Sequence, residues 1–172
     1  GAFVKLSSLD EASRRRGVVA MSAGNHAQGV AFHCQRLGIP ATIVMPKQTP
    51  FTKVERTAAL GAKVVQEGET LAESAGFAHA LAKDEGLTFI HPYDDELVIA
   101  GQGTVALEML ETVPELETLI IPIGGGGLIA GCAIAAKALN PAIQIFGVQT
   151  SLYPAMAERL KGREAICGGS TV

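Results

Sequence analysis

The sequence predicts an α/β fold made of open parallel-sheet subdomains, the second of them incomplete. Short apolar runs of strand character alternate with helical patterns along the chain, an alternation typical of parallel sheets connected by helices. Two polar, glycine-bearing turns, at 22–29 and 124–127, directly follow such runs, and in parallel sheets ligands gather at the carboxyl ends of the strands. Hydrophobic residues make up 48% of the 172 residues, enough for a buried core.

The first half of the chain is expected to contain four strands. Val18 to Met21 forms the first, and the following helix begins near His26 and ends at Gly38, since glycine favours helix ends. Thr52 to Glu55 has the pattern of a capping box, which predicts the start of another helix. The remaining elements expected here are the strands 41–45, 62–65 and 87–90 and the helix 70–85.

The second half contains only two strand patterns. A helix is expected from about Leu97 through Leu110, and it is followed by the strand 119–123, the helix 127–139, the strand 143–148 and the helix 153–160. A sheet of two apolar strands leaves much surface uncovered. We therefore expect a subdomain at 1–96 and part of a second one at 97–172.

Charge and composition argue against several classes of protein. The net charge of −3, the pI near 5.8 and a single basic run, Arg14 to Arg16, disfavour a nucleic-acid partner. Residues 119–136 carry no charge, but Pro122 and four glycines interrupt them, so we expect no membrane span. Three widely spaced cysteines fit a reduced, cytoplasmic setting.

The glycines Gly124 to Gly127 predict an anion-binding turn. Successive backbone N–H groups can bind one phosphate, and the helix that continues from Leu128 directs the positive end of its dipole to the same point. A tight turn or flexible loop is the simpler alternative, although such a turn usually needs only one or two glycines. A nucleotide P-loop is excluded because no Gly-Lys-Ser/Thr follows.

The segment Ser22 to Gly29 predicts a cradle for a carboxylate. A serine hydroxyl, an asparagine amide and backbone N–H groups meet where a helix begins, and Gly24 lets the backbone approach a ligand. An ordinary N-cap supplied by Ser22 or Asn25 is the alternative, and the sequence leaves it open.

Three further patterns are explained better by a structural role than by a metal or catalytic site. His26 and His33 stand seven residues apart without a third ligand nearby, so we expect no metal site. The acids at 94–96 fit a helix N-terminus better than a pair of catalytic carboxylates. Gln102 to Thr104 places a glycine inside a helical pattern, which indicates close packing or a hinge.

Three motifs together carry a resemblance to a known family. They are Ser-Ala-Gly-Asn-His-Ala-Gln-Gly at 22–29, His-Pro-Tyr-Asp-Asp with Ala-Gly-Gln-Gly-Thr within 91–104, and Pro-Ile-Gly-Gly-Gly-Gly-Leu at 122–128. In order and spacing they resemble the fold-type-II pyridoxal-phosphate enzymes, and most closely the threonine/serine dehydratase branch. The resemblance extends from Gly1 to Val172. It implies that 1–96 is the small subdomain, which binds the substrate carboxylate, and that 97–172 is part of the large, pyridoxal-phosphate-binding subdomain, which is truncated.

The resemblance implies a cofactor, a reaction and a set of site residues. Pyridoxal 5′-phosphate would be the cofactor, and the parent enzyme, a cytoplasmic homo-oligomer, would convert the amino acid L-threonine to 2-oxobutanoate and ammonia. The implied cofactor-binding residues are Asn25 at the pyridine 3′-oxygen and Gly124, Gly125, Gly126, Gly127 and Leu128 at the phosphate. The implied residues for the substrate carboxylate are Ser22, Ala23, Gly24, Asn25 and His26.

The family's Schiff-base lysine has no counterpart among the residues of this sequence. Gly1 to Leu9 resembles the segment just downstream of that lysine, which is expected three residues before Gly1. The seven lysines, at 5, 47, 53, 63, 83, 137 and 161, stand in other contexts. We therefore expect an internal fragment that assigns no catalytic residue to this chain and is inactive alone.

Other functions stay open as alternatives. Serine racemases resemble this chain, but they usually carry a second serine where Ala23 stands and acidic cation ligands where Gln149 and Ala155 stand. A non-catalytic module that binds pyridoxal phosphate or another anion is the second alternative. Another lyase or synthase of the same fold is the third, and His26 to Gln28 argues against its cysteine-synthase-like members.

Overall fold

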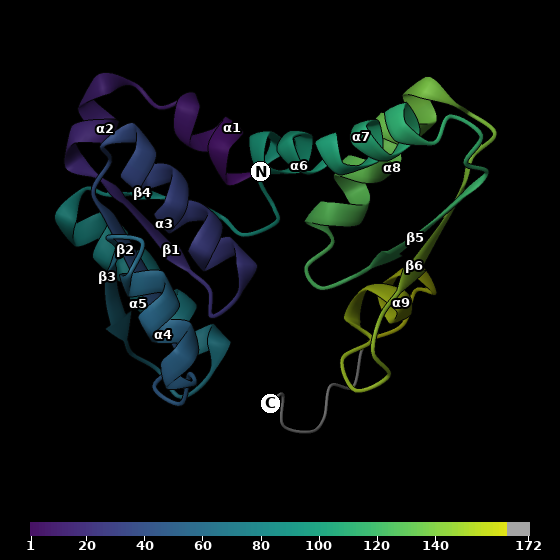
Figure 1. Cartoon of the computed structure of the whole chain (residues 1–172). Coiled ribbons are helices and arrows are strands. Elements are labelled where there is room, and N and C mark those ends of the chain that lie inside the picture. Colours follow the sequence, from purple (N-terminus) through teal and green to yellow (C-terminus); the bar gives the residue numbers. More distant parts are fainter. Residues whose placement is uncertain (165–172) are drawn as a thin grey trace. The chain divides into compact units, whose positions relative to one another are not determined.

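Four parallel strands form the centre of the first of two units into which the chain divides. The computed structural model describes residues 1–164; the first unit is Gly1–Pro92, and the second begins at Tyr93 (Figure 1). Our expected boundary, after residue 96, lies slightly further along the chain. The assignment of the units to a small and a large subdomain stays a prediction.

In the first unit β1 is one of the two inner strands of the sheet, and it lies between β2 and β4. The strands are β1 Val18–Met21, β2 Ala41–Met45, β3 Lys63–Gln66 and β4 Thr88–Phe89, in the sheet order β3-β2-β1-β4. All pairings are parallel, and Val18 of β1 lies beside Ala41 of β2 and Thr88 of β4. The predicted strands 18–21 and 41–45 are confirmed, the third is displaced by one residue, and the fourth is shorter than predicted.

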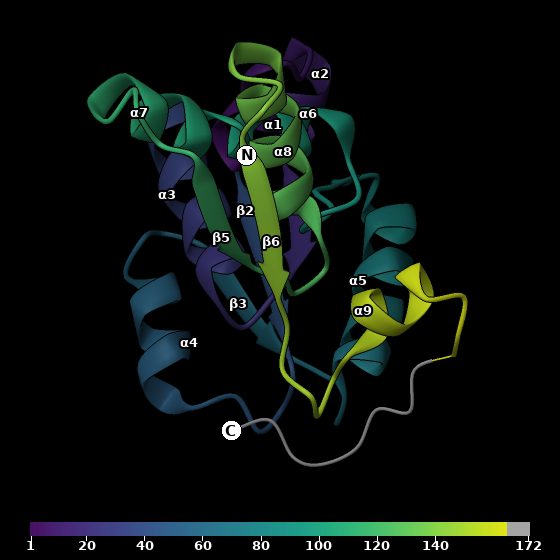
Figure 2. The same ribbon diagram turned by 90° about the vertical axis from the view of Figure 1, so that its right-hand side faces the viewer.

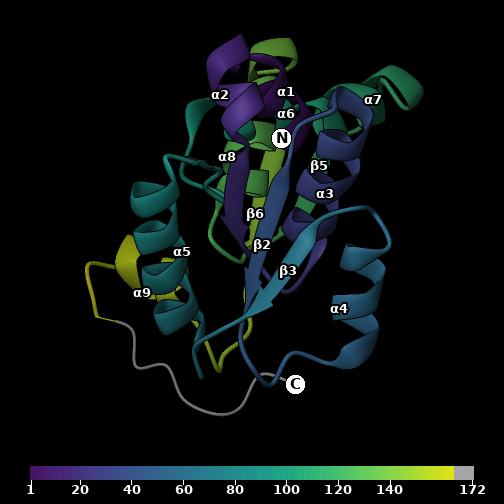
Figure 3. The ribbon, with the colours of Figure 1, turned by 90° about the vertical axis from the view of Figure 1, so that its left-hand side faces the viewer.

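Helices cover both faces of this sheet. They are α1 Ala2–Ser7, α2 Glu11–Arg16, α3 Asn25–Leu37, α4 Phe51–Ala58 and α5 Leu71–Glu85. Figure 3 shows α3 and α5 on opposite sides of the strands. Val18 and Ala20 pack in the core with α3, whereas Val19 packs with Ala78 of α5, because successive side chains of a strand point to opposite faces.

One expectation about these helices is wrong, and two further helices were not expected. The capping box at Thr52 does not form, because α4 begins one residue earlier, at Phe51, with Pro50 as its N-cap. The helices α1 and α2 were not predicted from the sequence. Each has six residues, too few for a clear helical period. Asp10 caps α2 by accepting the N–H of Ser13 at 2.7 Å.

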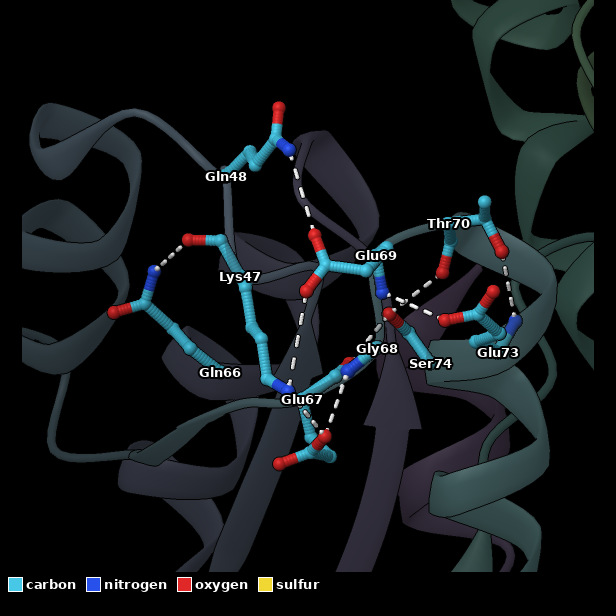
Figure 4. A network of polar contacts seen from close by, with 9 residues as sticks. All are labelled: Lys47, Gln48, Gln66, Glu67, Gly68, Glu69, Thr70, Glu73 and Ser74. Atoms are coloured by element: carbon cyan, nitrogen blue, oxygen red, sulfur yellow. Dashed lines mark hydrogen bonds and ion pairs between the residues drawn. The ribbon is translucent and has the colours of Figure 1, made fainter.

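A polar network connects the loops that follow β2 and β3 to the start of α5 (Figure 4). Lys47 Nζ lies 2.9 Å from Glu67 Oε1, and the bond to Glu67 raises the pKa of Lys47. Ser74 Oγ donates to the Glu67 carbonyl at 2.7 Å, and Thr70 caps α5 by accepting the N–H of Glu73 at 3.2 Å. The network thus orders the carboxyl ends of both strands.

The second unit has two parallel strands, β5 Thr118–Pro122 and β6 Gln144–Val148, as its sequence indicates. Its helices are α6 Glu96–Gln102, α7 Thr104–Thr112, α8 Gly127–Leu139 and α9 Ala155–Leu160. Ile120, Phe146 and Val148 are 70%, 54% and 55% exposed on one face of the sheet. Figure 2 looks onto β5 and β6 side by side, without a described helix of this unit over them. None of the described helices has the length and apolar character needed to cross a membrane.

The predicted helix 97–110 is two helices, α6 and α7, which meet at Gly103. A Cβ on Gly103 would lie 2.9 Å from the Gly131 carbonyl oxygen of α8, and a Cβ on Gly131 would overlap the Ile99 carbonyl oxygen. The backbones therefore approach so closely that neither position has room for a side chain. The expected close packing at Gly103 is confirmed.

Gly131→Ala is expected to lower the free energy of unfolding by about 1–3 kcal/mol, because the new methyl group overlaps backbone atoms that cannot rotate away. Gly76→Ala in α5 is the matched control, since its Cβ would meet no atom within 4 Å. Alanine is the better helix former, so the control gains roughly 0.5–1 kcal/mol. Denaturant unfolding followed by circular dichroism measures both; equal stability of the two variants would refute the packing argument.

Candidate functional site

The turn that follows β1 is fixed to the strands on both sides of it. Ser22 N–H donates to the Val44 carbonyl of β2 at 3.1 Å. On the other side, Ile90, which follows β4, donates its N–H to the Val19 carbonyl at 2.8 Å and has its own carbonyl oxygen 3.1 Å from His26 Nε2. The start of α3 is thereby held at the carboxyl edge of the sheet.

Neither Ser22 nor Asn25 serves as an ordinary cap of α3. The N-cap is Gly24, which has no side chain, and the hydroxyl of Ser22 accepts the N–H of Gly24 itself at 3.1 Å. The interpretation of this segment as only an N-cap is therefore wrong. Within residues 1–164, no backbone carbonyl or capping side chain accepts the N–H groups of Asn25, His26 and Ala27.

The structure leaves room for a side chain at Gly24. A Cβ on Gly24 would meet no atom within 4 Å, so the packing of this unit does not by itself require glycine there. Ala23 is half-buried, whereas the Asn25 side chain is exposed. The positive end of α3, its unpartnered N–H groups and this open position form a site suited to a small anion.

The imidazole of His26 is largely buried in this arrangement. Burial is the main cause that lowers its pKa, and the nearby His91 and the α-amino group of Gly1 lower it further, against the opposing effect of the bond to Ile90. His26 is therefore neutral at pH 7.

The turn 124–127 occupies the corresponding position in the second unit, after β5. Ile123 N–H donates to the Val148 carbonyl at 2.7 Å, and the next backbone N–H with a carbonyl partner in the described chain is that of Ala130, 3.0 Å from the Gly126 oxygen. The N–H groups from Gly124 through Ile129 lie between these two. The Leu128 side chain packs against the core of the unit, so only its backbone is available to a ligand.

Three of the four glycines of this turn are required by the fold, for different reasons. Cβ atoms on Gly125 and Gly127 would overlap or crowd Tyr93, the first against its ring and the second against its backbone. Gly126 has a φ of +96°, which side chains rarely adopt. A Cβ on Gly124 would meet nothing within 4 Å. The fold accounts for three glycines, as the tight-turn alternative proposes, and leaves Gly124 facing open space.

Tyr93 is the residue of this site that the sequence did not identify. Its ring packs on Gly125, which follows it by 32 positions, and no periodicity connects two loop segments so far apart. The neighbouring Asp95 accepts the N–H groups of Leu97 and Val98 at 3.0 Å, which confirms that the acids at 94–96 begin a helix.

Gln149 has a structural role in the second unit. Gln149 Oε1 accepts the N–H groups of Met156 and Ala157, both at 3.1 Å, at the start of α9. In the described residues no three His, Cys, Asp or Glu side chains form a group able to hold a metal ion.

Gly125→Ala is expected to destabilise the second unit by about 1–3 kcal/mol, because the methyl group overlaps the Tyr93 ring. Gly124→Ala, the adjacent control, should leave the free energy of unfolding within about 0.5 kcal/mol of the original. Thermal unfolding compares the two variants, and a loss of stability from Gly124→Ala as large as that from Gly125→Ala would contradict the distinction between them.

Comparisons with known proteins agree with this geometry. L-threonine ammonia-lyase of Thermotoga maritima is 46% identical over 180 residues, which cover 100% of this chain and 45% of that protein. The processed form of threonine deaminase isoform 2 from Solanum lycopersicum matches with a TM-score of 0.89 and 41% identity, over 95% of this chain and 48% of that one. Maize serine racemase matches with a TM-score of 0.92 and 38% identity, over 99% and 52%.

The chain spans about half the length of the curated relatives it matches. A family model described as pyridoxal-phosphate dependent enzyme matches residues 1–170. The parallel α/β units and this match lead to one conclusion: the chain belongs to the family of pyridoxal-phosphate dependent enzymes.

Proposed function

We propose that the protein containing this chain is a pyridoxal-phosphate-dependent threonine dehydratase, which converts L-threonine to 2-oxobutanoate and ammonia. The observation that carries the proposal is the first turn of α3, where three N–H groups have no carbonyl partner among the described residues and a Cβ on Gly24 would meet no atom within 4 Å. That arrangement suits the carboxylate of an amino acid. The identity to L-threonine ammonia-lyase supports threonine as that amino acid.

The turn 124–127 fits the phosphate of the cofactor. Its backbone N–H groups have no carbonyl partners among the described residues, and the position of a Cβ on Gly124 is open. Gly124 to Gly127 and the N–H of Leu128 would hold the phosphate at the positive end of α8. When bound, pyridoxal phosphate supplies an electron-withdrawing ring that makes the α-proton of an attached amino acid acidic.

The residues at 22–26 would orient the substrate. Ser22, through its hydroxyl, and the backbone of Ala23, Gly24, Asn25 and His26 would receive the carboxylate, while the exposed amide of Asn25 would reach the 3′-oxygen of the cofactor. A carboxylate fixed by several N–H groups restricts rotation about the bond to Cα. The α-proton is then presented in one direction, which favours its removal over side reactions.

Serine racemase is the second candidate, and its resemblance to this chain is substantial. The dehydratase is favoured because Ala23 has no hydroxyl to return a proton from the opposite face. Gln149, moreover, is engaged with the start of α9 instead of carrying a cation ligand. A non-catalytic module with the same two anion sites is the third candidate; threonine turnover by the parent protein excludes it.

The setting of the parent protein is part of the proposal. We place it in the cytoplasm because Cys34 and Cys132 are buried free thiols, the state maintained by a reducing compartment. A homo-oligomer is proposed from the resemblance alone, and analytical ultracentrifugation of the parent protein measures it.

Gly124→Ala in the parent protein is expected to weaken pyridoxal-phosphate binding about tenfold without loss of stability, because the methyl group occupies the open position and costs roughly one charge-assisted hydrogen bond. Gly24→Ala should instead raise the KM for L-threonine by a similar factor. Cofactor affinity is measured by absorbance titration and KM by 2-oxobutanoate formation. Gly76→Ala is the control; unchanged binding in both glycine variants would refute the site assignments.

The lysines of this chain are proposed not to serve as the cofactor's covalent partner. Incubation of the 172-residue chain with pyridoxal phosphate, borohydride reduction and mass spectrometry should give no stoichiometric adduct at one of the seven lysines, and no threonine turnover. A stoichiometric adduct at one of them together with turnover would show that the chain carries its own catalytic lysine.

A further inference from the structure

His26 is held by a carbonyl group and not by a charged one. Its Nε2 lies 3.1 Å from the Ile90 oxygen, 64 positions along the chain. A carbonyl oxygen only accepts hydrogen bonds, so Nε2 must carry the proton. In the neutral ring the other nitrogen, Nδ1, is then unprotonated and cannot donate a hydrogen bond to a carboxylate.

Ile90 is itself rigidly placed. Its side chain is fully buried, and its N–H bonds to the Val19 carbonyl at 2.8 Å. The bond from His26 to Ile90 therefore connects the first turn of α3 to β1 and β4. On the opposite side, Ser22 N–H bonds to Val44 of β2. These two connections determine where the N–H groups of Asn25 to Ala27 point.

The surroundings of the ring favour its uncharged form. Burial is the main influence, and the charged or titratable groups of this unit that affect the ring are His91, in the segment after β4, and the α-amino group of Gly1, before α1. Both disfavour a second positive charge, and both lower the pKa of His26. No anion of the first unit opposes them among the influences on this ring.

We propose that His26 is a positioning residue, whose Nε2–H bond to Ile90 holds the first turn of α3 so that main-chain N–H groups, and not the imidazole, bind the substrate carboxylate. This inference rests on the proposed function for the identity of the ligand. Its structural part concerns only residues of the first unit. The imidazole contributes a hydrogen bond and a fixed backbone, with no charge.

Two substitutions of His26 test whether its hydrogen bond to Ile90, and not a charge on its ring, holds the turn. His26→Gln keeps an N–H donor near the place of Nε2, whereas the shorter side chain of His26→Asn does not reach Ile90. Neither carries a charge. His33→Asn is the control, because His33 lies two turns further along α3 and contacts the rings of Phe3 and Phe32 rather than β4.

The first measurement is the protonation of the ring itself. Long-range 1H–15N spectra of the 172-residue protein, with His26→Gln for assignment, are expected to show the Nε2–H tautomer of His26, uncharged at pH 7 and titrating below the ordinary histidine range. A protonated ring at pH 7, or the Nδ1–H tautomer, would overturn the proposal. This result does not depend on any ligand.

The second measurement follows the backbone. Hydrogen exchange of the Gln28 amide, which bonds to the Gly24 carbonyl at 3.3 Å, should be about fivefold faster in His26→Asn and near the original rate in His26→Gln and His33→Asn. Equal acceleration in the Asn and Gln variants would show that the donor to Ile90 is not what holds the turn.

The third measurement is made on the parent enzyme. His26→Asn should raise the KM for L-threonine about fivefold, His26→Gln should restore it to within about twofold, and neither should change the pH dependence of KM between pH 6 and 8. An equal KM loss in both variants would overturn the role of the donor bond. If the spectra and exchange data agree with the proposal but threonine is not a substrate, the proposed function fails while the positioning role stands.

Discussion

The structure of the first unit depends on how the inner strand β1 ends. The chain leaves the sheet at the carboxyl end of β1 and enters the turn before α3. Hydrogen bonds connect this turn to both sides, from Ser22 to β2 and from His26 to Ile90, which follows β4. Because both connections are short, the first turn of α3 has little freedom to move. Its N–H groups are therefore held in fixed positions, which is what binding an anion without reorganising the protein requires.

In the second unit, side-chain packing fixes much of the turn that follows β5. Tyr93 lies against Gly125 and Gly127, and the positive φ of Gly126 turns the chain into α8. The loop is therefore ordered by packing. Glycine is required at positions 125 and 127, because a Cβ there would overlap or crowd Tyr93. Gly124, which has no such neighbour, is the position at which selection for a ligand and selection for the fold can be distinguished.

Strand and helix positions followed from the sequence where the pattern was long and uniform. The strands 18–21 and 41–45 and the helix 127–139 agree with β1, β2 and α8 because apolar runs or helical periods there are bounded by glycine or proline. Prediction failed at α1 and α2, which are too short to show a period, and at Gly103, where contact with Gly131 of another helix interrupts the pattern. The first failure is one of length, whereas at Gly103 a tertiary contact overrides the local helical preference.

The two glycine-bearing segments could be singled out from the order of residues, because backbone N–H groups at a glycine-rich helix start can bind an anion. The family and its cofactor were recognised from the resemblance of the motifs, and the family match confirms them. The partners of these segments were not recognisable. Ile90 stands 64 positions from His26 and Tyr93 stands 32 from Gly125, so only the folded chain shows which carbonyl His26 bonds and which glycines the tyrosine requires. Local sequence determines what a turn can bind, whereas packing between distant segments determines how rigidly it is held.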